Sequence, residues 1–178
     1  MDAGELRLLA QMPLHAITAM YGEAGLRERF ALETAPLPGP DRDRIARALA
    51  LASRLHAADL RQREPYVNHL LRVATRISCY YGITDADVLC AALLHDAVED
   101  HPAELAASGV MEARRETAGT DGGAGGSAAG AALGVLAAQF GARVAELVGA
   151  VTNPAYRAGQ DKAQQYREHV AASLAASP

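Results

Sequence analysis

Aromatic residues are scarce in this 178-residue chain, where they make up 4% of the sequence, and tryptophan is absent. Alanine takes their place, with 40 residues. A composition so rich in alanine and so poor in aromatic and β-branched residues favours helices over sheets. Half of the residues are hydrophobic and 21% are charged, which excludes a globally disordered chain. Length and composition together predict one all-α domain with a sizeable core.

The chain also has few cysteines, no net positive charge and no long apolar run. Cys79 and Cys90 lie in apolar stretches with no second Cys-x-x-Cys pair, so we expect two buried thiols in a reducing cytoplasm. The net charge of −4 provides no basic field for nucleic acid or an anionic membrane. No run approaches the ~18 consecutive apolar residues of a membrane span, and the acidic N-terminus does not resemble a signal peptide. We therefore expect a cytoplasmic protein with no nucleic-acid and no membrane partner.

Breaker residues divide the chain into a short first part and a longer second part. Residues 1–35 have the pattern of one or two helices, and the proline-rich run 35–40 interrupts them. We expect residues 1–35 to be an N-terminal helical extension and residues 36–178 to form the main domain. Within that domain, the Gly- and Ala-rich segment 119–130 predicts a flexible loop, because such a run cannot bury a core.

Hydrophobic periodicity predicts a series of helices in the main domain. The first carries His56 on its apolar stripe, and Pro65 is expected to open the next one, which Gly82 ends. Thr84 is expected to cap a third helix that runs without interruption from residue 85 to about residue 100. Pro102 disfavours helical geometry at His101, just beyond the end of this helix. Further helices are expected over 133–151, as a pair, and over 161–176.

The segment 93–100, with the sequence LLHDAVED, carries the strongest chemical signal. On one continuous helix, residues four apart share a face, so His95 would lie over Glu99 and Asp96 over Asp100. Burial of carboxylates beside imidazole is costly unless a cation compensates, and this donor set suits Mn, Fe, Zn or Ni better than Ca. The alternative interpretation is a solvated helix end, because a His-Asp dipeptide alone arises often by chance.

A second histidine and two arginines lie upstream of this segment. His69 flanks the apolar stripe of its predicted helix, a position that suits either a metal ligand or a core-edge histidine bonded to the backbone. Arg61 and Arg63 come just before that helix. They are either a clamp for phosphate or a nucleotide base, or ordinary solvated arginines.

These elements, taken in order, resemble the hydrolase domain of RelA/SpoT-type alarmone proteins and the stand-alone small alarmone hydrolases. Both groups belong to the HD superfamily of metal-dependent phosphohydrolases. The resemblance extends from about residue 48 to residue 152 and is carried by Glu-Pro-Tyr-x-x-His at 64–69 and His-Asp-x-x-Glu-Asp at 95–100. It implies an all-α HD-domain helical bundle with a Mn²⁺ ion, for which His69, His95 and Asp96 match three of the ligands.

The resemblance also implies roles for the remaining residues of the site. Glu99 and Asp100 match the acidic pair that acts around the attacking water. Arg61 matches the arginine of an Arg-Lys nucleotide-contact motif, in which the lysine is missing here, and Arg63 and Tyr66 are further candidates for substrate binding. The implied reaction is hydrolysis of guanosine tetra- or pentaphosphate at the 3′ position, which gives GDP or GTP and pyrophosphate.

One departure from the family concerns the last metal ligand, an Asp in a later motif like Ala-Asp-Arg-Leu-His-Asn. The sequence ends about where that helix would begin, so we expect a bundle truncated before it, with Asp161, Glu168 or His169 as the available substitutes. Three alternatives to an active enzyme follow. They are a catalytically impaired module that binds a nucleotide or pairs with another subunit, a purely structural bundle, and a fragment of a longer enzyme. An uncovered part of the core would favour a homodimer.

Overall fold

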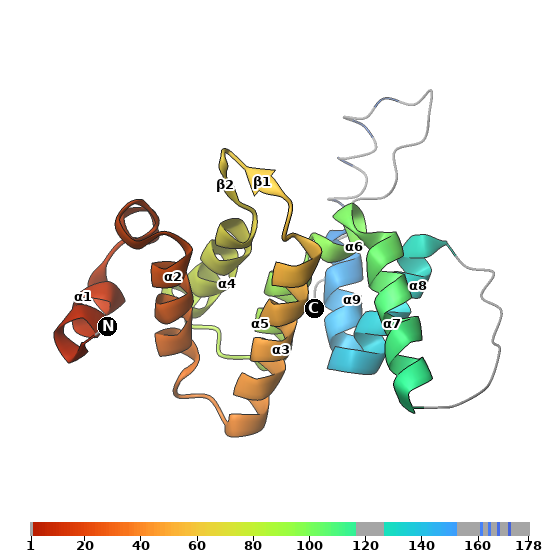
Figure 1. Cartoon of the computed structure of the whole chain (residues 1–178), viewed down its shortest axis with the longest axis horizontal. Coiled ribbons are helices and arrows are strands. Elements are labelled where there is room, and N and C mark those ends of the chain that lie inside the picture. The colour runs from red at the N-terminus through yellow and green to blue at the C-terminus, as the bar shows by residue number, and fades with distance from the viewer. Residues whose placement is uncertain are drawn as a thin grey trace. The chain divides into compact units, whose positions relative to one another are not determined.

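The computed structural model describes residues 2–116 and 127–152, together with the single positions 161, 164, 167 and 171. Helices make up nearly all of its regular structure, which confirms the predicted all-α class (Figure 1). The chain divides into two compact units, Met1–Ala97 and Val98–Pro178. None of the described helices combines the length and the apolarity that crossing a membrane requires.

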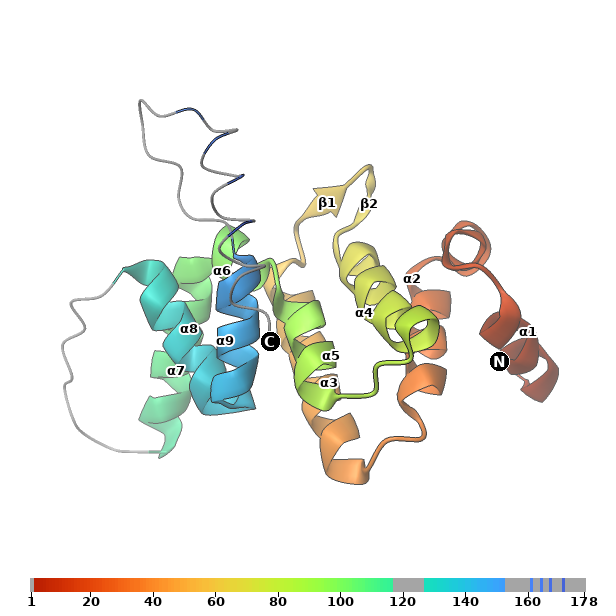
Figure 2. The ribbon, with the colours of Figure 1, turned by 180° about the vertical axis from the view of Figure 1, so that it is seen from behind.

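The first unit is built from five helices among its described residues. α4 lies between α2 and α5, and α5 also packs against α3, while α1 packs against α2 (Figures 1 and 2). Apolar side chains fill the spaces between these helices, among them Ile17, Leu26, Ile45, Leu70, Leu71, Leu89 and Leu93. The bounds are α1 (Ala3–Gln11), α2 (Leu14–Thr34), α3 (Gly39–Leu55), α4 (Val67–Tyr81) and α5 (Ala86–Leu94).

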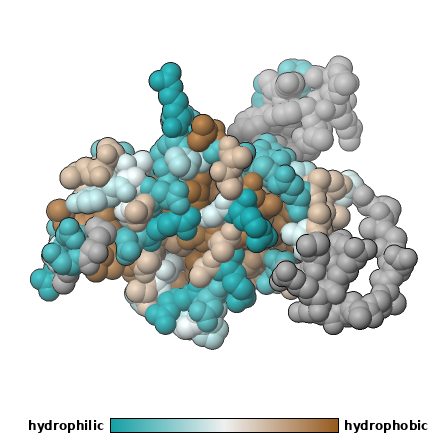
Figure 3. Space-filling model, in the orientation of Figure 1, coloured by the Kyte–Doolittle hydropathy of each residue, from teal (hydrophilic) through white to brown (hydrophobic). Residues whose placement is uncertain are grey.

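The surface of the described residues is mixed in character. Hydrophilic side chains cover much of the face seen in Figure 3, and hydrophobic ones show between them. A few large apolar side chains are exposed, including those of Leu60, Tyr80 and Tyr81. Cys90 is buried, as the sequence predicts, whereas the prediction is wrong for Cys79, which is half-buried, and both are free thiols.

Gly82 ends α4, as the sequence predicts, in the left-handed conformation with φ 66° and ψ 19°. A side chain at this φ is strained, although the space around it is open. We expect Gly82→Ala to lower the free energy of unfolding by about 1–2 kcal/mol, the cost of a left-handed residue with a Cβ atom. Urea denaturation measures this change, and a variant as stable as the parent would contradict the expectation.

α5 begins at a different cap from the predicted one. Asp85 is the N-cap residue, and its side chain accepts a hydrogen bond from the backbone N–H of Asp87 at 2.9 Å. The prediction that Thr84 caps this helix is therefore wrong by one position. An Asp satisfies the unpaired N–H groups of a first helical turn as well as a Thr does, so the sequence offers two adjacent caps.

A short hairpin precedes α4, where the sequence predicts that Pro65 opens the helix. Instead, β1 (Leu60–Arg61) pairs antiparallel with β2 (Glu64–Pro65), and α4 begins two residues later. The turn residues Gln62 and Arg63 both have positive φ, 53° and 69°. Two-residue hairpin turns of this kind usually contain Asn-Gly, so the sequence carries no signal for the turn.

The predicted helix over residues 85–100 is interrupted. α5 ends at Leu94, His95 and Asp96 form a turn, and α6 (Ala97–Asp100) follows. His95 Nδ1 lies 2.9 Å from the carbonyl oxygen of Ala92. In a continuous helix that oxygen accepts a hydrogen bond from the N–H of residue 96, so the imidazole competes with the helical bond.

The second unit begins within α6 and contains α7 (Pro102–Glu116), α8 (Ala128–Phe140) and α9 (Ala142–Val151). Pro102 is the first residue of α7, in agreement with the predicted break before it. α8 packs against both α7 and α9. Ser127 caps α8, so residues 128–130 of the predicted flexible segment are helical. Residues 119–126 and most of the predicted last helix lie outside the described residues.

Candidate metal centre

α4 and the turn between α5 and α6 bring three potential metal ligands together. One ligand atom from each of His69, His95 and Asp96 lies within 4.8 Å of the other two. His95 Nε2 is 3.0 Å from Asp96 Oδ2, and His69 Nε2 is 3.6 Å from the same oxygen. All three residues are half-buried. Because all belong to the first unit, its own packing fixes this arrangement.

The local sequence explains how each side chain reaches this position. On α4, Leu70, Leu71 and Ala74 are fully buried, which leaves His69 at the edge of the apolar stripe. The other two side chains come from the end of α5. This helix ends after Leu94, so His95 and Asp96 project from a turn rather than from a continuous helix. The two imidazole rings meet edge to face, with their centroids 5.4 Å apart.

Tyr66 joins this cluster from the N-terminal end of α4. Its hydroxyl group donates a hydrogen bond of 2.7 Å to Asp96 Oδ2 and accepts one of 3.1 Å from Arg61. The Tyr66 ring stacks on His56, with centroids 4.5 Å apart and an angle of 11° between the planes. The sequence predicts Tyr66 as a substrate contact and contains no signal for its bond to Asp96.

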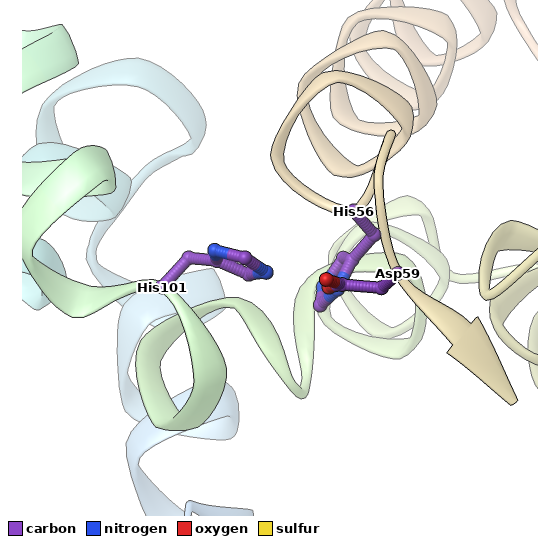
Figure 4. A group of neighbouring side chains, drawn as sticks. All are labelled: His56, Asp59 and His101. Carbon is purple, nitrogen blue, oxygen red and sulfur yellow. The ribbon is translucent and has the colours of Figure 1, made fainter.

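His56 and Asp59 form a second pair of interest that the sequence analysis missed. His56 Nδ1 lies 2.7 Å from Asp59 Oδ2, and the two side chains face each other in Figure 4. The His56 side chain is fully buried. The sequence signal for this pair is its spacing of three residues, because a histidine at the end of a helix can then contact an acid in the turn that follows. His101, also labelled in Figure 4, belongs to the second unit and pairs there with Glu104.

The protonation states follow from burial and from neighbouring charges. Burial lowers the pKa of His69 to about 4, with a further contribution from the Arg61 guanidinium. Burial also opposes protonation of His95, but the hydrogen bond and the charge of Asp96 outweigh it and raise the His95 pKa. For Asp96, burial favours the neutral acid, yet hydrogen bonds from His95 and Tyr66 lower its pKa to about 2. At neutral pH the cluster therefore contains a neutral His69 beside an ionised Asp96.

A family described as HD domain matches residues 48–176, which is most of the chain. The chain belongs to the HD-domain family. This finding confirms the superfamily inferred from the two sequence motifs.

Three proteins similar to this HD-domain chain share one description, guanosine-3′,5′-bis(diphosphate) 3′-pyrophosphohydrolase MESH1. The Drosophila melanogaster protein is 57% identical over 44 residues, which is 25% of each chain. The Xenopus tropicalis protein is 59% identical over 39 residues, or 22% of each chain. The Homo sapiens protein is 42% identical over 65 residues, or 35% of this chain and 36% of that protein. The matched stretches thus span about a quarter to a third of these relatives. No solved structure matches the chain.

The donor set fits a divalent cation of the kind that HD-domain hydrolases bind. It comprises two imidazole nitrogens and one carboxylate oxygen, which suit a transition metal better than calcium. His95 Nδ1 is held at the Ala92 carbonyl oxygen, so its Nε2 atom is directed to the cluster, as is usual for metal-binding histidines. A set of three protein ligands leaves positions open for water or substrate.

The other predicted site residues have more exposed positions. Arg61 and Arg63 are exposed at the hairpin, and Arg61 contacts Tyr66. Glu99 and Asp100 are exposed on α6 and belong to the second unit. The prediction that His95 lies over Glu99 and Asp96 over Asp100 assumed one continuous helix, which is interrupted at His95 and Asp96, so helical spacing no longer supports it. The roles of these four residues stay predictions. Of the predicted substitute ligands, Asp161 is exposed, and Glu168 and His169 lie outside the described residues.

Proposed function

We propose that this HD-domain protein is a metal-dependent phosphohydrolase that removes the 3′ pyrophosphate group of guanosine 3′,5′-bis(diphosphate). The observation that carries the proposal is the convergence of His69, His95 and Asp96 within 4.8 Å. The names of the three relatives support the choice of substrate, because the matched stretches are 42–59% identical.

His69, His95 and Asp96 are the residues that would hold the cation, for which Mn²⁺ is our choice. A bound divalent cation polarises a phosphoryl oxygen and lowers the pKa of a coordinated water. His69 is well suited to this task because burial lowers its pKa to about 4, so at neutral pH its imidazole has a free lone pair. The ionised Asp96 supplies the negative charge of the site.

The remaining residues bind the substrate and handle protons. The Arg61 guanidinium, exposed beside Tyr66, is available to a phosphate group or a guanine ring, and Arg63 adds a second positive charge. Glu99 or Asp100 accepts a proton from the attacking water. The water oxygen bonds to the phosphorus next to the 3′ oxygen. The 3′ oxygen then leaves with its electron pair and takes up a proton.

We assign the protein to the cytoplasm, with a small-molecule nucleotide as its substrate and no nucleic-acid or membrane partner. The free thiols of Cys79 and Cys90 support a reducing compartment. The net charge of −4 gives no support for binding to nucleic acid. The predicted homodimer and the predicted extension at residues 1–35 stay predictions, although α2 from that segment packs against α4.

The decisive assay uses the purified chain with Mn²⁺ and guanosine 3′,5′-bis(diphosphate). We expect GDP and pyrophosphate to form in equal amounts, and a chelator to stop the reaction until Mn²⁺ is restored. Ion-exchange chromatography identifies the nucleotide product, and a coupled assay quantifies pyrophosphate. Release of orthophosphate instead would contradict the assigned bond cleavage. Binding of Mn²⁺ and nucleotide without any product would identify the protein as a nucleotide-binding module.

A further inference from the structure

A series of contacts leads from the buried His56 to the metal cluster. Asp59 Oδ2 lies 2.7 Å from His56 Nδ1, and the His56 ring stacks on Tyr66 with centroids 4.5 Å apart. The Tyr66 hydroxyl group then donates a hydrogen bond of 2.7 Å to Asp96 Oδ2. Three of these residues belong to the segment between α3 and α4, and only Asp96 comes from another part of the first unit.

Backbone bonds keep this segment in register. The Asp59 N–H group donates to the His56 carbonyl oxygen, and the Tyr66 N–H group donates to the Asp59 carbonyl oxygen, each at 3.1 Å. Asp59 therefore contacts His56 through its side chain and Tyr66 through its backbone. Since His56 is 3% exposed, its ring is a fixed surface against which the Tyr66 ring rests.

The oxygen that Tyr66 contacts is the one at the centre of the cluster. Asp96 Oδ2 lies 3.6 Å from His69 Nε2 and 3.0 Å from His95 Nε2. The terminal torsion of an aspartate side chain is broad, so neighbouring bonds have to select the direction of its oxygens. The Tyr66 hydroxyl group provides such a bond.

We propose that Tyr66 is a positioning residue, which holds Asp96 Oδ2 between the two histidine Nε2 atoms, and that the stack on the His56–Asp59 pair fixes the Tyr66 ring for this task. The inference rests on the metal site of the proposed function but not on the substrate. It differs from the predicted role of Tyr66 as a substrate contact in one measurable respect. A positioning residue changes metal affinity in the absence of any nucleotide, whereas a substrate contact changes KM.

Tyr66→Phe is the sharpest variant, because it removes the hydroxyl group and keeps the ring that stacks on His56. We expect its Kd for Mn²⁺ to rise about 10–100-fold, the usual effect of losing a partner of a metal ligand. The electron paramagnetic resonance signal of free Mn²⁺ measures this affinity without nucleotide. The metal-free variant should keep the parent's fold, although the loss of a hydrogen bond to the ionised Asp96 should lower its melting temperature slightly. Tyr80→Phe, at an exposed tyrosine of the same helix, is the matched control and should bind Mn²⁺ like the parent.

Activity gives a second, independent measurement. In Tyr66→Phe the Mn²⁺ concentration needed for half-maximal hydrolysis should rise by the same factor as the Kd, and saturating Mn²⁺ should restore kcat. An unchanged Mn²⁺ affinity, or a change in KM for the nucleotide alone, would overturn the inference. A protein that binds Mn²⁺ more weakly after Tyr66→Phe, but releases no pyrophosphate even as wild type, would confirm the inference and refute the proposed function. A wild-type protein that binds no Mn²⁺ would overturn both.

The part played by the His56–Asp59 pair is tested by a double-mutant cycle. Asp59→Ala removes the partner of the His56 ring and leaves the buried ring itself in place. We expect it to weaken Mn²⁺ binding in the wild-type background and to add little in the Tyr66→Phe background, because its effect passes through the tyrosine hydroxyl group. Equal effects in the two backgrounds would show that Asp59 does not act through Tyr66, which overturns this part of the inference.

Discussion

Replacement of Asp96 by asparagine is expected to abolish both Mn²⁺ binding and pyrophosphate release. Asp96 Oδ2 accepts a hydrogen bond from Tyr66 and lies 3.6 Å from His69 Nε2 and 3.0 Å from His95 Nε2. Asparagine keeps the volume of the side chain and removes its charge. Loss of a partner of a ligand already costs about 10–100-fold in metal affinity. Loss of the one anionic member of the group should therefore cost more, and we expect at least about a 100-fold effect on that scale.

Two measurements and one matched control make this prediction specific. The control is Asp43→Asn, because Asp43 is an exposed aspartate on α3 and takes no part in the proposed site. Mn²⁺ at about a hundred times the parent Kd should stabilise the parent and the control by about 2.7 kcal/mol, and should stabilise Asp96→Asn by no more than about 0.4 kcal/mol. Calorimetry measures this stabilisation, and the pyrophosphate assay measures turnover. Parental turnover by Asp96→Asn would show that the assigned centre is not the active site.

The all-α fold could be predicted from the sequence itself, whereas the grouping of His69, His95 and Asp96 was predicted through the resemblance to the HD superfamily. Alanine content and helical periodicity favour helices wherever the chain packs. On α4 the apolar stripe places His69 at its edge, since the leucines that follow it are buried. The combination of two spaced motifs then indicated an HD domain, which the family match confirms.

The hairpin and the helix break could not be predicted, because each depends on contacts that local sequence does not reveal. Gln62 and Arg63 have positive φ although neither is glycine or asparagine, the residue types that usually mark such a turn. At His95 the imidazole lies at the Ala92 carbonyl oxygen, and periodicity alone gives no sign of that contact. The predicted alignment of Glu99 and Asp100 with the cluster assumed a continuous helix, and the turn at His95 and Asp96 removes that basis.

Both departures occur beside the cluster. His95 keeps helical dihedral angles, with φ −59° and ψ −33°, and in the turn after Leu94 its Nε2 atom lies 3.0 Å from Asp96 Oδ2. The hairpin ends just before Tyr66, at the start of α4, where its hydroxyl group reaches the same oxygen. Deviations from ideal local structure are expected at functional sites, and these two adjoin the proposed metal site.

Leu70→Ala is expected to lower the free energy of unfolding by about 2–5 kcal/mol, the range for a leucine truncated in a closed core. Leu70 is fully buried next to His69, on the helix that packs against both α2 and α5. Small domains have only about 5–15 kcal/mol of stability, so the loss is a large part of the total.

The matched control for this variant is Leu60→Ala, because Leu60 is 71% exposed at the hairpin. Exposed substitutions usually change stability by no more than about 0.5 kcal/mol. Urea denaturation compares the two variants with the parent, and saturating Mn²⁺ should raise the midpoint of Leu70→Ala because the native site binds the ion and the unfolded chain does not. Equal midpoints for the two leucine variants would show that α4 is not held in the core by Leu70. The support for His69 would then have to come from the polar contacts around Tyr66.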